Sequence, residues 1–255
     1  MGIPRHHFGW RRRIGFMSPT VIETTAYDFF RLAPEGIGIC GITSSIDFWD
    51  ADNFKRSLDN ILIASEYLKS RHVDFISHTG MPLVTTRGKG FEDELVAMIT
   101  ARTGVPASTS IRSAIRALDH LGVKRVALAS PYPQELHQSA IRFLQASGFE
   151  VVVEGTLDVD FKRLQDVRPE QIHRHVMQVI ARAKRVDGVY IPCNQWNAAD
   201  AAALIEDDFG IPVVTGGHAD FWEAFRVMGV HDLIEGHGRL MRSLADMPRQ
   251  QRVVE

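Results

Sequence analysis

The chain of 255 residues carries an internal repeat, and this feature constrains its fold more than any other. Three segments of the N-terminal part recur in the same order, at offsets of 112, 113 and 106 residues. The pairs are 12–20 with 124–132, 73–80 with 186–193, and 103–110 with 209–216. Because related segments in the same order fold alike, the repeat predicts two similar α/β halves. Their equivalent strand ends should face each other across a cleft.

One pair of equivalent strand ends differs between the halves in a way that bears on chemistry. Cys193 follows a predicted strand of the second half, whereas its counterpart in the first half is Gly80. A cleft that is otherwise symmetric is therefore expected to hold a single thiol.

Short apolar runs alternate with longer amphipathic segments, a pattern typical of parallel sheets covered by helices on both faces. The expected strands cover 14–17, 37–42, 73–76, 107–109, 126–129, 151–155, 189–191 and 213–214. The expected helices cover 54–67, 91–100, 110–121, 133–146, 169–183, 198–208, 219–227 and about 233–244. The predicted fold class is α/β, with two pseudo-symmetric halves. Each half is a roughly four-stranded parallel sheet flanked by helices, and the active-site cleft lies between them.

The predicted division of the chain places the first half at residues 1–115 and the second at 116–230. The last helix, within residues 231–255, is expected to return to the first half, and residues 246–255 to form a frayed tail. No linker rich in Pro, Gly or Ser separates the halves, so they should pack closely.

Composition excludes several classes of function. The net charge of −2 implies no broad surface for nucleic acid, and the basic segment 5–13 is interpreted as a solvated arm. No apolar run reaches the roughly 18 residues of a membrane span, and no apolar stretch follows the basic N-terminus as in a secretory signal. A cytoplasmic location is therefore expected. A homo-oligomer is compatible with the sequence.

Cofactors and metals are not expected either. The two cysteines, Cys40 and Cys193, form neither a disulfide framework nor a metal-type spacing. The chain has no Walker loop and no GxGxxG fingerprint, so a nucleotide cofactor is not predicted. A hydrolase is not indicated, because no GxSxG elbow is present.

The candidate site follows from the rule that ligands bind beyond the carboxyl ends of parallel strands. Eleven residues fall at such ends and are predicted to surround one cleft. They are Pro19, Thr20, Thr79, Gly80, Met81, Tyr132, Cys193, Asn194, Thr215, Gly216 and Gly217.

Cys193 is the candidate catalytic group. A helix should begin near Asn197, and the positive end of its dipole would lower the pKa of the thiol toward neutrality. Such a thiol can exchange a proton with carbon. The alternative is a buried structural cysteine. Cys40, inside an apolar run, is interpreted as a core residue.

Several other residues near the strand ends could contribute to the site or serve the fold alone. Gly80 permits a positive φ and a close backbone approach to a ligand, although it could also be an ordinary turn glycine. His78 is expected to be a core or supporting residue rather than a base. The turn 215–217 offers N–H donors to a carboxylate. Asp220 is interpreted as a first-turn helix charge, and Glu23 as a residue that either reaches the cleft or starts a helix.

These features together resemble a known group of enzymes, the aspartate/glutamate racemase superfamily. Within it, the chain resembles the branch of arylmalonate decarboxylase and maleate cis-trans isomerase. The resemblance covers residues 12 to 230. It is carried by the segments 13–19, 79–88 and 126–132, by Cys193, and by 210–214 through Phe221-Trp222.

The resemblance implies a mechanism without a cofactor. Racemases and maleate isomerases of the superfamily use two cysteines, of which this chain matches only the second, with Cys193. Arylmalonate decarboxylase likewise has glycine at the first position, loses CO2 from a malonate, and protonates the enediolate with one cysteine. The resemblance then implies Cys193 as proton donor, Tyr132 as oxyanion donor and the Gly80-Met81 backbone as further donors.

The chain also departs from that pattern. Met81-Pro82 stands where the decarboxylase has Thr-Ser, Asn194 replaces a glycine, and Ile22 replaces an asparagine of the isomerases. The leading hypothesis is a cofactor-independent decarboxylase of a small carboxylic acid. The alternatives are a racemase or cis-trans isomerase of a small carboxylate, with His78 or water replacing the missing cysteine, and a non-catalytic carboxylate-binding relative.

Overall fold

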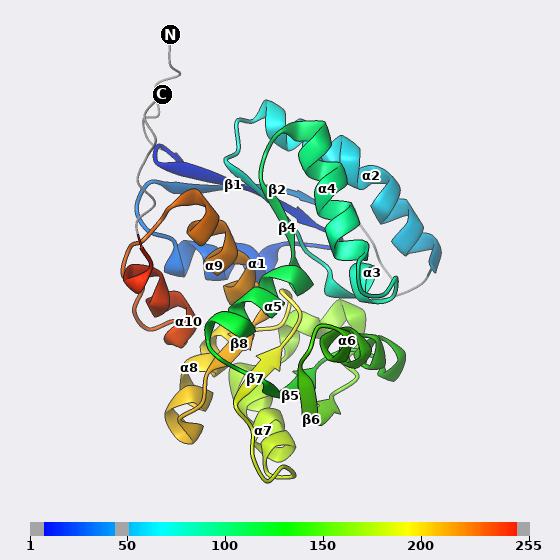
Figure 1. Cartoon of the computed structure of the whole chain (residues 1–255), viewed down its shortest axis with the longest axis vertical. Coiled ribbons are helices and arrows are strands. Elements are labelled where there is room, and N and C mark those ends of the chain that lie inside the picture. The colour runs from blue at the N-terminus through cyan, green and yellow to red at the C-terminus, as the bar shows by residue number, and fades with distance from the viewer. Residues whose placement is uncertain (1–7, 44–50, 249–255) are drawn as a thin grey trace.

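The computed structural model describes residues 8–43 and 51–248, and its framework is a pair of four-stranded parallel sheets. The first sheet has the order β2-β1-β3-β4, and the second has the order β6-β5-β7-β8. The bounds are β1 Arg12–Ser18, β2 Ile37–Thr43, β3 Phe75–His78, β4 Ala107–Thr109, β5 Arg125–Ser130, β6 Glu150–Thr156, β7 Gly188–Ile191 and β8 Val213–Thr215. The two sheets have the same topology, so the α/β class and the repeat of two halves are confirmed (Figure 1).

Helices cover the faces of both sheets, as the continuous apolar strands require. Their bounds are α1 Glu23–Leu32, α2 Ala51–Ser70, α3 Met81–Thr85, α4 Phe91–Thr103, α5 Ser110–His120, α6 Gln134–Ala146, α7 Pro169–Ile180, α8 Ala198–Phe209, α9 Gly216–Met228 and α10 Gly238–Arg242. Two short 3-10 helices, η1 Phe161–Asp166 and η2 Ser243–Asp246, complete the described elements. Every predicted strand is present within a few residues of its predicted bounds.

Three elements were not predicted, namely α1, α3 and η1. Helix α3 begins at Met81, directly after Gly80, and Pro82 lies in its first turn, where the missing N–H costs no hydrogen bond. Helix α9 begins at Gly216, three residues earlier than predicted. Thr215 caps it, because its hydroxyl accepts a hydrogen bond from the N–H of His218 at 3.2 Å.

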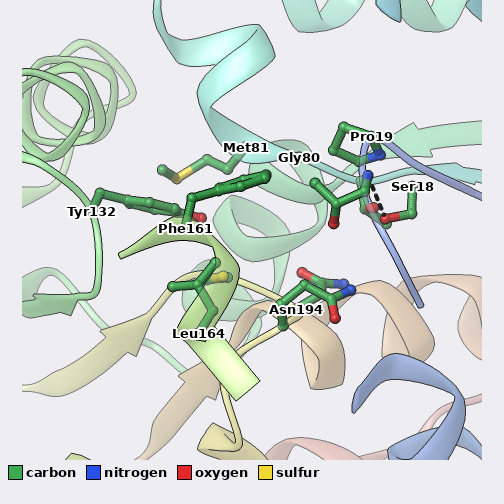
Figure 2. Close-up of a pocket in the computed structure, with 12 residues that line it drawn as sticks. Ser18, Pro19, Gly80, Met81, Tyr132, Phe161, Leu164 and Asn194 are labelled. Carbon is green, nitrogen blue, oxygen red and sulfur yellow. Dashed lines mark hydrogen bonds between the residues drawn. The ribbon is translucent and has the colours of Figure 1, made fainter. Parts of the chain in front are cut away.

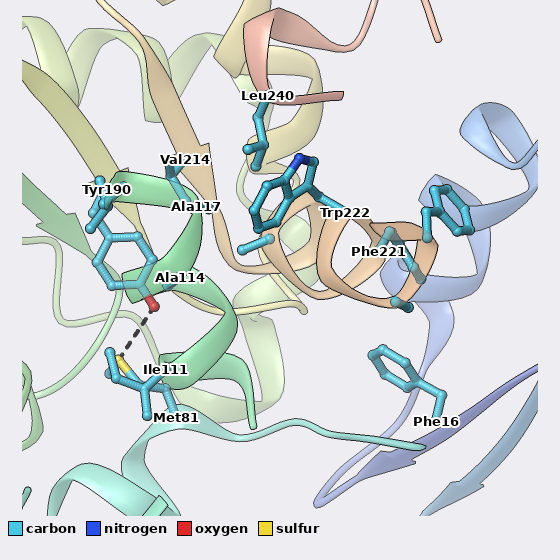
Figure 3. Packing of buried hydrophobic residues seen from close by; sticks show 14 of the residues in the cluster. Phe16, Met81, Ile111, Ala114, Ala117, Tyr190, Val214, Phe221, Trp222 and Leu240 are labelled. Atoms are coloured by element: carbon cyan, nitrogen blue, oxygen red, sulfur yellow. Dashed lines mark hydrogen bonds between the residues drawn. The ribbon is translucent and has the colours of Figure 1, made fainter. Parts of the chain in front are cut away.

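The core is continuous across the two halves, because α5 and α9 pack against each other and contact strands of both sheets. Phe221 of α9 stacks on Phe16 of β1 with ring centroids 6.0 Å apart. On the other side, the Tyr190 hydroxyl of β7 donates to the Met81 sulfur at 3.7 Å (Figure 3). One hydrophobic cluster therefore spans both halves and fixes the strand ends of one relative to those of the other, while a second cluster packs β5, β7 and β8 against α7 and α8 within the second half.

The C-terminal segment differs from the single predicted helix. Gly236 and Gly238 have φ values of +78° and +79°, so the helix is confined to the short α10 and η2. Helix α10 contacts α8, α9 and β8, while Asp232 pairs with Arg11 beside β1 at 2.6 Å. The proposed domain division remains a prediction. Residues 5–7 of the basic arm and 249–255 of the tail lie outside the described residues.

Across residues 8–43 and 51–248, every helix is too short or too polar to span a bilayer. In the same part of the chain, no three His, Cys, Asp or Glu side chains cluster in a way that could hold a metal ion.

Candidate active site

A pocket lies between the halves at the carboxyl ends of β1, β3, β5 and β7 (Figure 2). Its empty volume is about 340 Å³, which includes open solvent at its mouth. Its lining residues are Ser18, Pro19, Thr20, Thr79, Gly80, Met81, Tyr132, Phe161, Leu164, Cys193, Asn194 and Gln195. None of these carries a cationic side chain, so an anionic ligand would have to be held by neutral donors.

Eight of the eleven predicted residues line this pocket, namely Pro19, Thr20, Thr79, Gly80, Met81, Tyr132, Cys193 and Asn194. The other three, Thr215, Gly216 and Gly217, do not line it and form the capped start of α9. Among the residues that sequence reasoning missed, Ser18 and Gln195 directly flank predicted positions. Phe161 and Leu164 come from η1, which was not predicted. A sequence signal existed and was overlooked, because Val159-Asp160-Phe161 echoes Ile46-Asp47-Phe48 at an offset of 113 residues.

Cys193 follows β7 in a strained backbone conformation, with a φ of +86°. Its sulfur accepts hydrogen bonds from the backbone N–H groups of Gln195 and Trp196 and from the Tyr132 hydroxyl. These three donors stabilise a thiolate, but burial outweighs them and raises the pKa of Cys193 to about 11. The expectation of a lowered pKa was therefore wrong. Helix α8 begins only at Ala198, and desolvation dominates.

Gly80 lies on the opposite wall and has a φ of +94°. A Cβ atom built at this position would lie 2.6 Å from Cγ of Pro19 and 3.2 Å from Leu83. Both the backbone conformation and the neighbouring Pro19 ring thus require glycine here. Among the lining residues, all within the described part of the chain, Cys193 is the only cysteine.

Tyr132 is buried in the turn after β5, and its hydroxyl reaches the Cys193 sulfur. Burial and the neighbouring Cys193 raise the pKa of this phenol well above its ordinary value, so it remains a neutral donor. A chain of hydrogen bonds supports the turn. Ser130 Oγ bonds His137 Nδ1 at 2.7 Å, and His137 Nε2 bonds Glu154 at 2.8 Å.

The hydroxyl groups at the end of β1 and β3 are already engaged. Thr79 donates both its hydroxyl and its N–H to the Met17 carbonyl, at 3.2 and 2.8 Å. Ser18 and Thr20 both donate to the Val21 carbonyl, at 3.2 and 3.3 Å. The backbone donor left at the start of α3 is the Met81 N–H, because Pro82 has no N–H and the Leu83 N–H donates to the Gly80 carbonyl at 3.0 Å.

The turn after Cys193 is fastened to the first half by α1. Thr24 donates to the Gln195 carbonyl and Thr25 to the Asn194 carbonyl, each at 3.3 Å. The Gln195 side chain in turn donates to the Val21 carbonyl. Glu23, in contrast, is an exposed first residue of α1 and does not line the pocket.

Asp220 is not the first-turn helix charge that the sequence suggested, because α9 begins four residues before it, at Gly216. It is only 1% exposed, and one carboxylate oxygen accepts hydrogen bonds from Asn194 Nδ2 and Ser110 Oγ, both at 2.7 Å. Burial raises its pKa to about 7. Asn194 is the pocket residue that follows Cys193, so Asp220 reaches the site through it.

The remaining titratable candidates lie away from the pocket wall. His78 is buried within β3, and burial lowers its pKa to about 4. His218 is buried in the first turn of α9, where burial lowers its pKa to about 3. Cys40 of β2 is partly buried and packs against the core. The predicted supporting role of His78 is untested.

Comparison with known proteins links this arrangement to a family. The family model described as arylmalonate decarboxylase matches residues 24–241. An arylmalonate decarboxylase of Bordetella bronchiseptica is 25% identical over 243 residues, which cover 89% of this chain and 95% of that protein. A maleate isomerase of Geobacillus stearothermophilus is 22% identical over 180 residues, covering 68% of this chain and 71% of that protein.

Solved structures share the fold. A mutant of arylmalonate decarboxylase in its liganded form matches with a TM-score of 0.84 at 22% identity, over 90% of this chain and 98% of that chain. The maleate cis-trans isomerase of Nocardia farcinica bound to TRIS also matches with a TM-score of 0.84, at 19% identity, over 92% of this chain and 100% of that chain. A mutant of the Nocardia enzyme was solved with a covalently bound succinylcysteine intermediate.

Proposed function

The chain belongs to the arylmalonate decarboxylase family, and from this membership we propose that it is a cofactor-independent decarboxylase of a small substituted malonate. Cys193 is the proposed proton donor to an enediolate intermediate. One observation carries the proposal: the pocket holds one thiol, and the opposite wall is closed at Gly80 by its backbone and by Pro19.

The number of thiols separates the reaction classes. Racemisation by two bases needs one group on each face of the reacting carbon. Decarboxylation needs a single acid, because CO2 rather than a proton leaves the other face. The raised pKa of Cys193 keeps the thiol protonated near neutrality, which suits an acid better than a nucleophile.

In the proposed reaction, one carboxylate of the malonate is held by the Gly80 and Met81 N–H groups, because the Tyr132 hydroxyl is committed to the Cys193 sulfur. The other carboxylate lies against the apolar wall of Met81, Phe161 and Leu164. Burial there disfavours its charge and promotes cleavage of the C–C bond. The electron pair of that bond passes into the remaining carboxylate, giving an enediolate, and CO2 leaves.

Protonation completes the reaction. The Cys193 thiol transfers its proton to the carbon, and the thiolate that remains is stabilised by the Gln195 and Trp196 N–H groups and the Tyr132 hydroxyl. Water then returns a proton to the sulfur. Because the thiol lies on one wall, the product acid is expected to be a single enantiomer when the carbon is prochiral.

The test is turnover of phenylmalonate and methylphenylmalonate, followed by CO2 release and chiral chromatography of the product. Wild type and Cys40→Ala should release CO2, and Cys193→Ala should not. Conversion of maleate to fumarate without malonate turnover would replace the proposal by an isomerase. Racemisation of aspartate or glutamate would replace it by a racemase. Carboxylate binding in calorimetry without turnover would indicate a non-catalytic relative.

A further inference from the structure

Asp220 is a buried carboxylate for which the described surroundings provide hydroxyl and amide partners rather than a cation. Oδ2 accepts hydrogen bonds from Asn194 Nδ2 and Ser110 Oγ, each at 2.7 Å, and the hydroxyls of Ser77 and Ser113 also act on the carboxylate. Burying a charge without an opposite charge costs free energy, so a purely structural site would favour a neutral residue. The position of Asp220 therefore calls for a specific reason.

The reason lies in what Asn194 does. It is the residue after Cys193 and lines the pocket, and its side chain packs against the start of α9. A Cβ atom built on Gly216 would lie 2.7 Å from Asn194 Oδ1 and 3.2 Å from the Cys193 N atom. Gly216 thus leaves room for Asn194 to reach Asp220, and the three residues form one contact set behind the thiol.

The turn that this set supports is under strain. Cys193 has a φ of +86°, in the left-handed region that is unfavourable for a residue with a side chain. Such a conformation persists only where the surroundings determine it. The backbone of the turn is held from the first half by Thr24 and Thr25, and its side-chain anchor in the second half is the bond from Asn194 to Asp220.

We propose that Asp220 is a positioning residue that acts through Asn194 to hold the strained Cys193 turn in the form that presents the thiol to the pocket. The inference deepens the proposed function, since it rests on Cys193 as the proton donor. Asp220 itself does not line the pocket and touches no reacting atom.

The charge of Asp220 decides the strength of this anchor. A carboxylate accepts stronger hydrogen bonds than the neutral acid, so the anchor weakens when Asp220 takes up a proton. Its pKa of about 7 places that change near neutrality. The groups around it from other elements are Ser77 of β3, Ser110 and Ser113 of α5, Tyr190 of β7, and Tyr132.

Two further groups are relevant to the pH dependence. One turn along α9, Glu223 is already paired with Arg116 and Arg226. Asp28 of α1 also has a pKa raised to about 7 by burial, but it has no bond to Asn194. Asp28→Asn is therefore the matched control, because it removes a carboxyl of similar pKa without touching the anchor.

The experiment uses the full chain in a Cys40→Ala background and follows two properties from pH 5.5 to 8.5. The first is kcat for phenylmalonate. We expect kcat to fall below pH 7 in the parent and in Asp28→Asn. Asp220→Asn should lose this pH dependence, with kcat at pH 8 about 10–100-fold lower and KM little changed, the size of effect that a small misplacement produces. Asn194→Ala and Gly216→Ala should behave alike, and Asp220→Asn combined with Asn194→Ala should be no worse than either single variant.

The second property is the rate of Cys193 alkylation by iodoacetamide, measured on the peptide by mass spectrometry, which needs no substrate. At alkaline pH, the logarithm of the alkylation rate of the parent should rise with pH at unit slope. Below pH 7, the measured rates of the parent should lie above the extrapolation of that line. For Asp220→Asn, the logarithm of the rate should rise linearly with pH over the whole range, and at pH 8 the variant should be alkylated several-fold faster than the parent. If these rates behave as expected while no malonate turns over, the positioning role stands and the proposed reaction fails.

The opposite pattern overturns the inference and leaves the reaction in place. In that case Asp220→Asn turns over malonate with the parent kcat and acid limb, and its alkylation rates match those of the parent. If the fall of kcat below pH 7 disappeared in Asp28→Asn instead, the pH dependence would be assigned to Asp28, and the inference would equally be overturned.

Discussion

Pro19 occupies the space beside Gly80 that any side chain on residue 80 would need, with its Cγ 2.6 Å from the position of an added Cβ. The φ of +94° at Gly80 adds a conformational cost to the steric one. The two residues lie at the ends of β1 and β3 and together close the wall opposite Cys193. The difference between the two halves is therefore more than the absence of a second thiol, because both Pro19 and the backbone of Gly80 exclude a side chain at residue 80.

This relationship changes the result expected for Gly80→Cys. From the repeat alone, the variant should place a second thiol across the cleft and give some racemase activity. With Pro19 in place, we expect it to lose stability and show no exchange. Gly80→Cys combined with Pro19→Gly should restore space for the sulfur. Deuterium exchange at Cα of 2-phenylpropionate measures the gain, and exchange in Gly80→Cys alone would show that Pro19 yields readily.

Cys193→Ala should abolish turnover, by at least the roughly 10²–10⁴-fold typical of an acid-base group. Its circular dichroism and melting temperature should stay close to wild type, because the change removes one sulfur atom from a side chain that lines the pocket. Cys40→Ala, with the same chemical change in a strand that packs against the core, should keep its activity. Full activity in Cys193→Ala would refute the mechanism.

Tyr132→Phe should lower kcat about 10–100-fold, because it removes one donor to the thiolate, worth about 1.5–3 kcal/mol for a charged acceptor. The fold should be retained, since the ring stays buried. Tyr190→Phe is the comparison, because its hydroxyl donates to the Met81 sulfur. Steady-state kinetics on phenylmalonate measure both, and equal losses in the two variants would contradict a specific role for Tyr132.

The stability of Asp220→Asn relative to wild type should depend on pH. The raised pKa means that native Asp220 keeps a proton, between about pH 4 and 7, that the unfolded chain has lost. Its contribution to stability is therefore present at acid pH and is lost as the pH rises through 7. Melting temperatures at pH 5 and 8 should show Asp220→Asn gaining on wild type at pH 8. Asp28, which titrates in the same direction, is retained in both proteins and cancels in the difference.

Activity should survive EDTA and exhaustive dialysis. The prediction rests on the residues, since those in the described part of the chain form no group able to hold a metal ion, and the sequence has no nucleotide fingerprint. Assay before and after treatment is sufficient. Restoration of a lost activity by zinc, NAD or pyridoxal phosphate would show that the site has been misinterpreted.

Local pattern and repetition determined the architecture. Apolar runs of strand length and the order of three repeated segments predicted eight parallel strands in two halves, because burial on both faces leaves a direct mark on the sequence. The same logic placed Pro19, Gly80, Tyr132 and Cys193 at strand ends, and the structure brings them to one pocket.

Only the tertiary structure decided what surrounds those residues. The pKa of Cys193 depends on desolvation by elements distant in sequence, which no local motif records. Phe161 and Leu164 reach the pocket from η1, a short helix that periodicity did not predict, and Pro19 fills the space beside Gly80. Asp220 was interpreted as a charge at the start of a helix because the residues that bury it are distant in sequence. Its partner Asn194 in the Cys193 turn is 26 residues away, and its partner Ser110 in α5 is 110 residues away. Periodicity encodes which face of an element is buried, whereas the identity of the group against that face is set by packing alone.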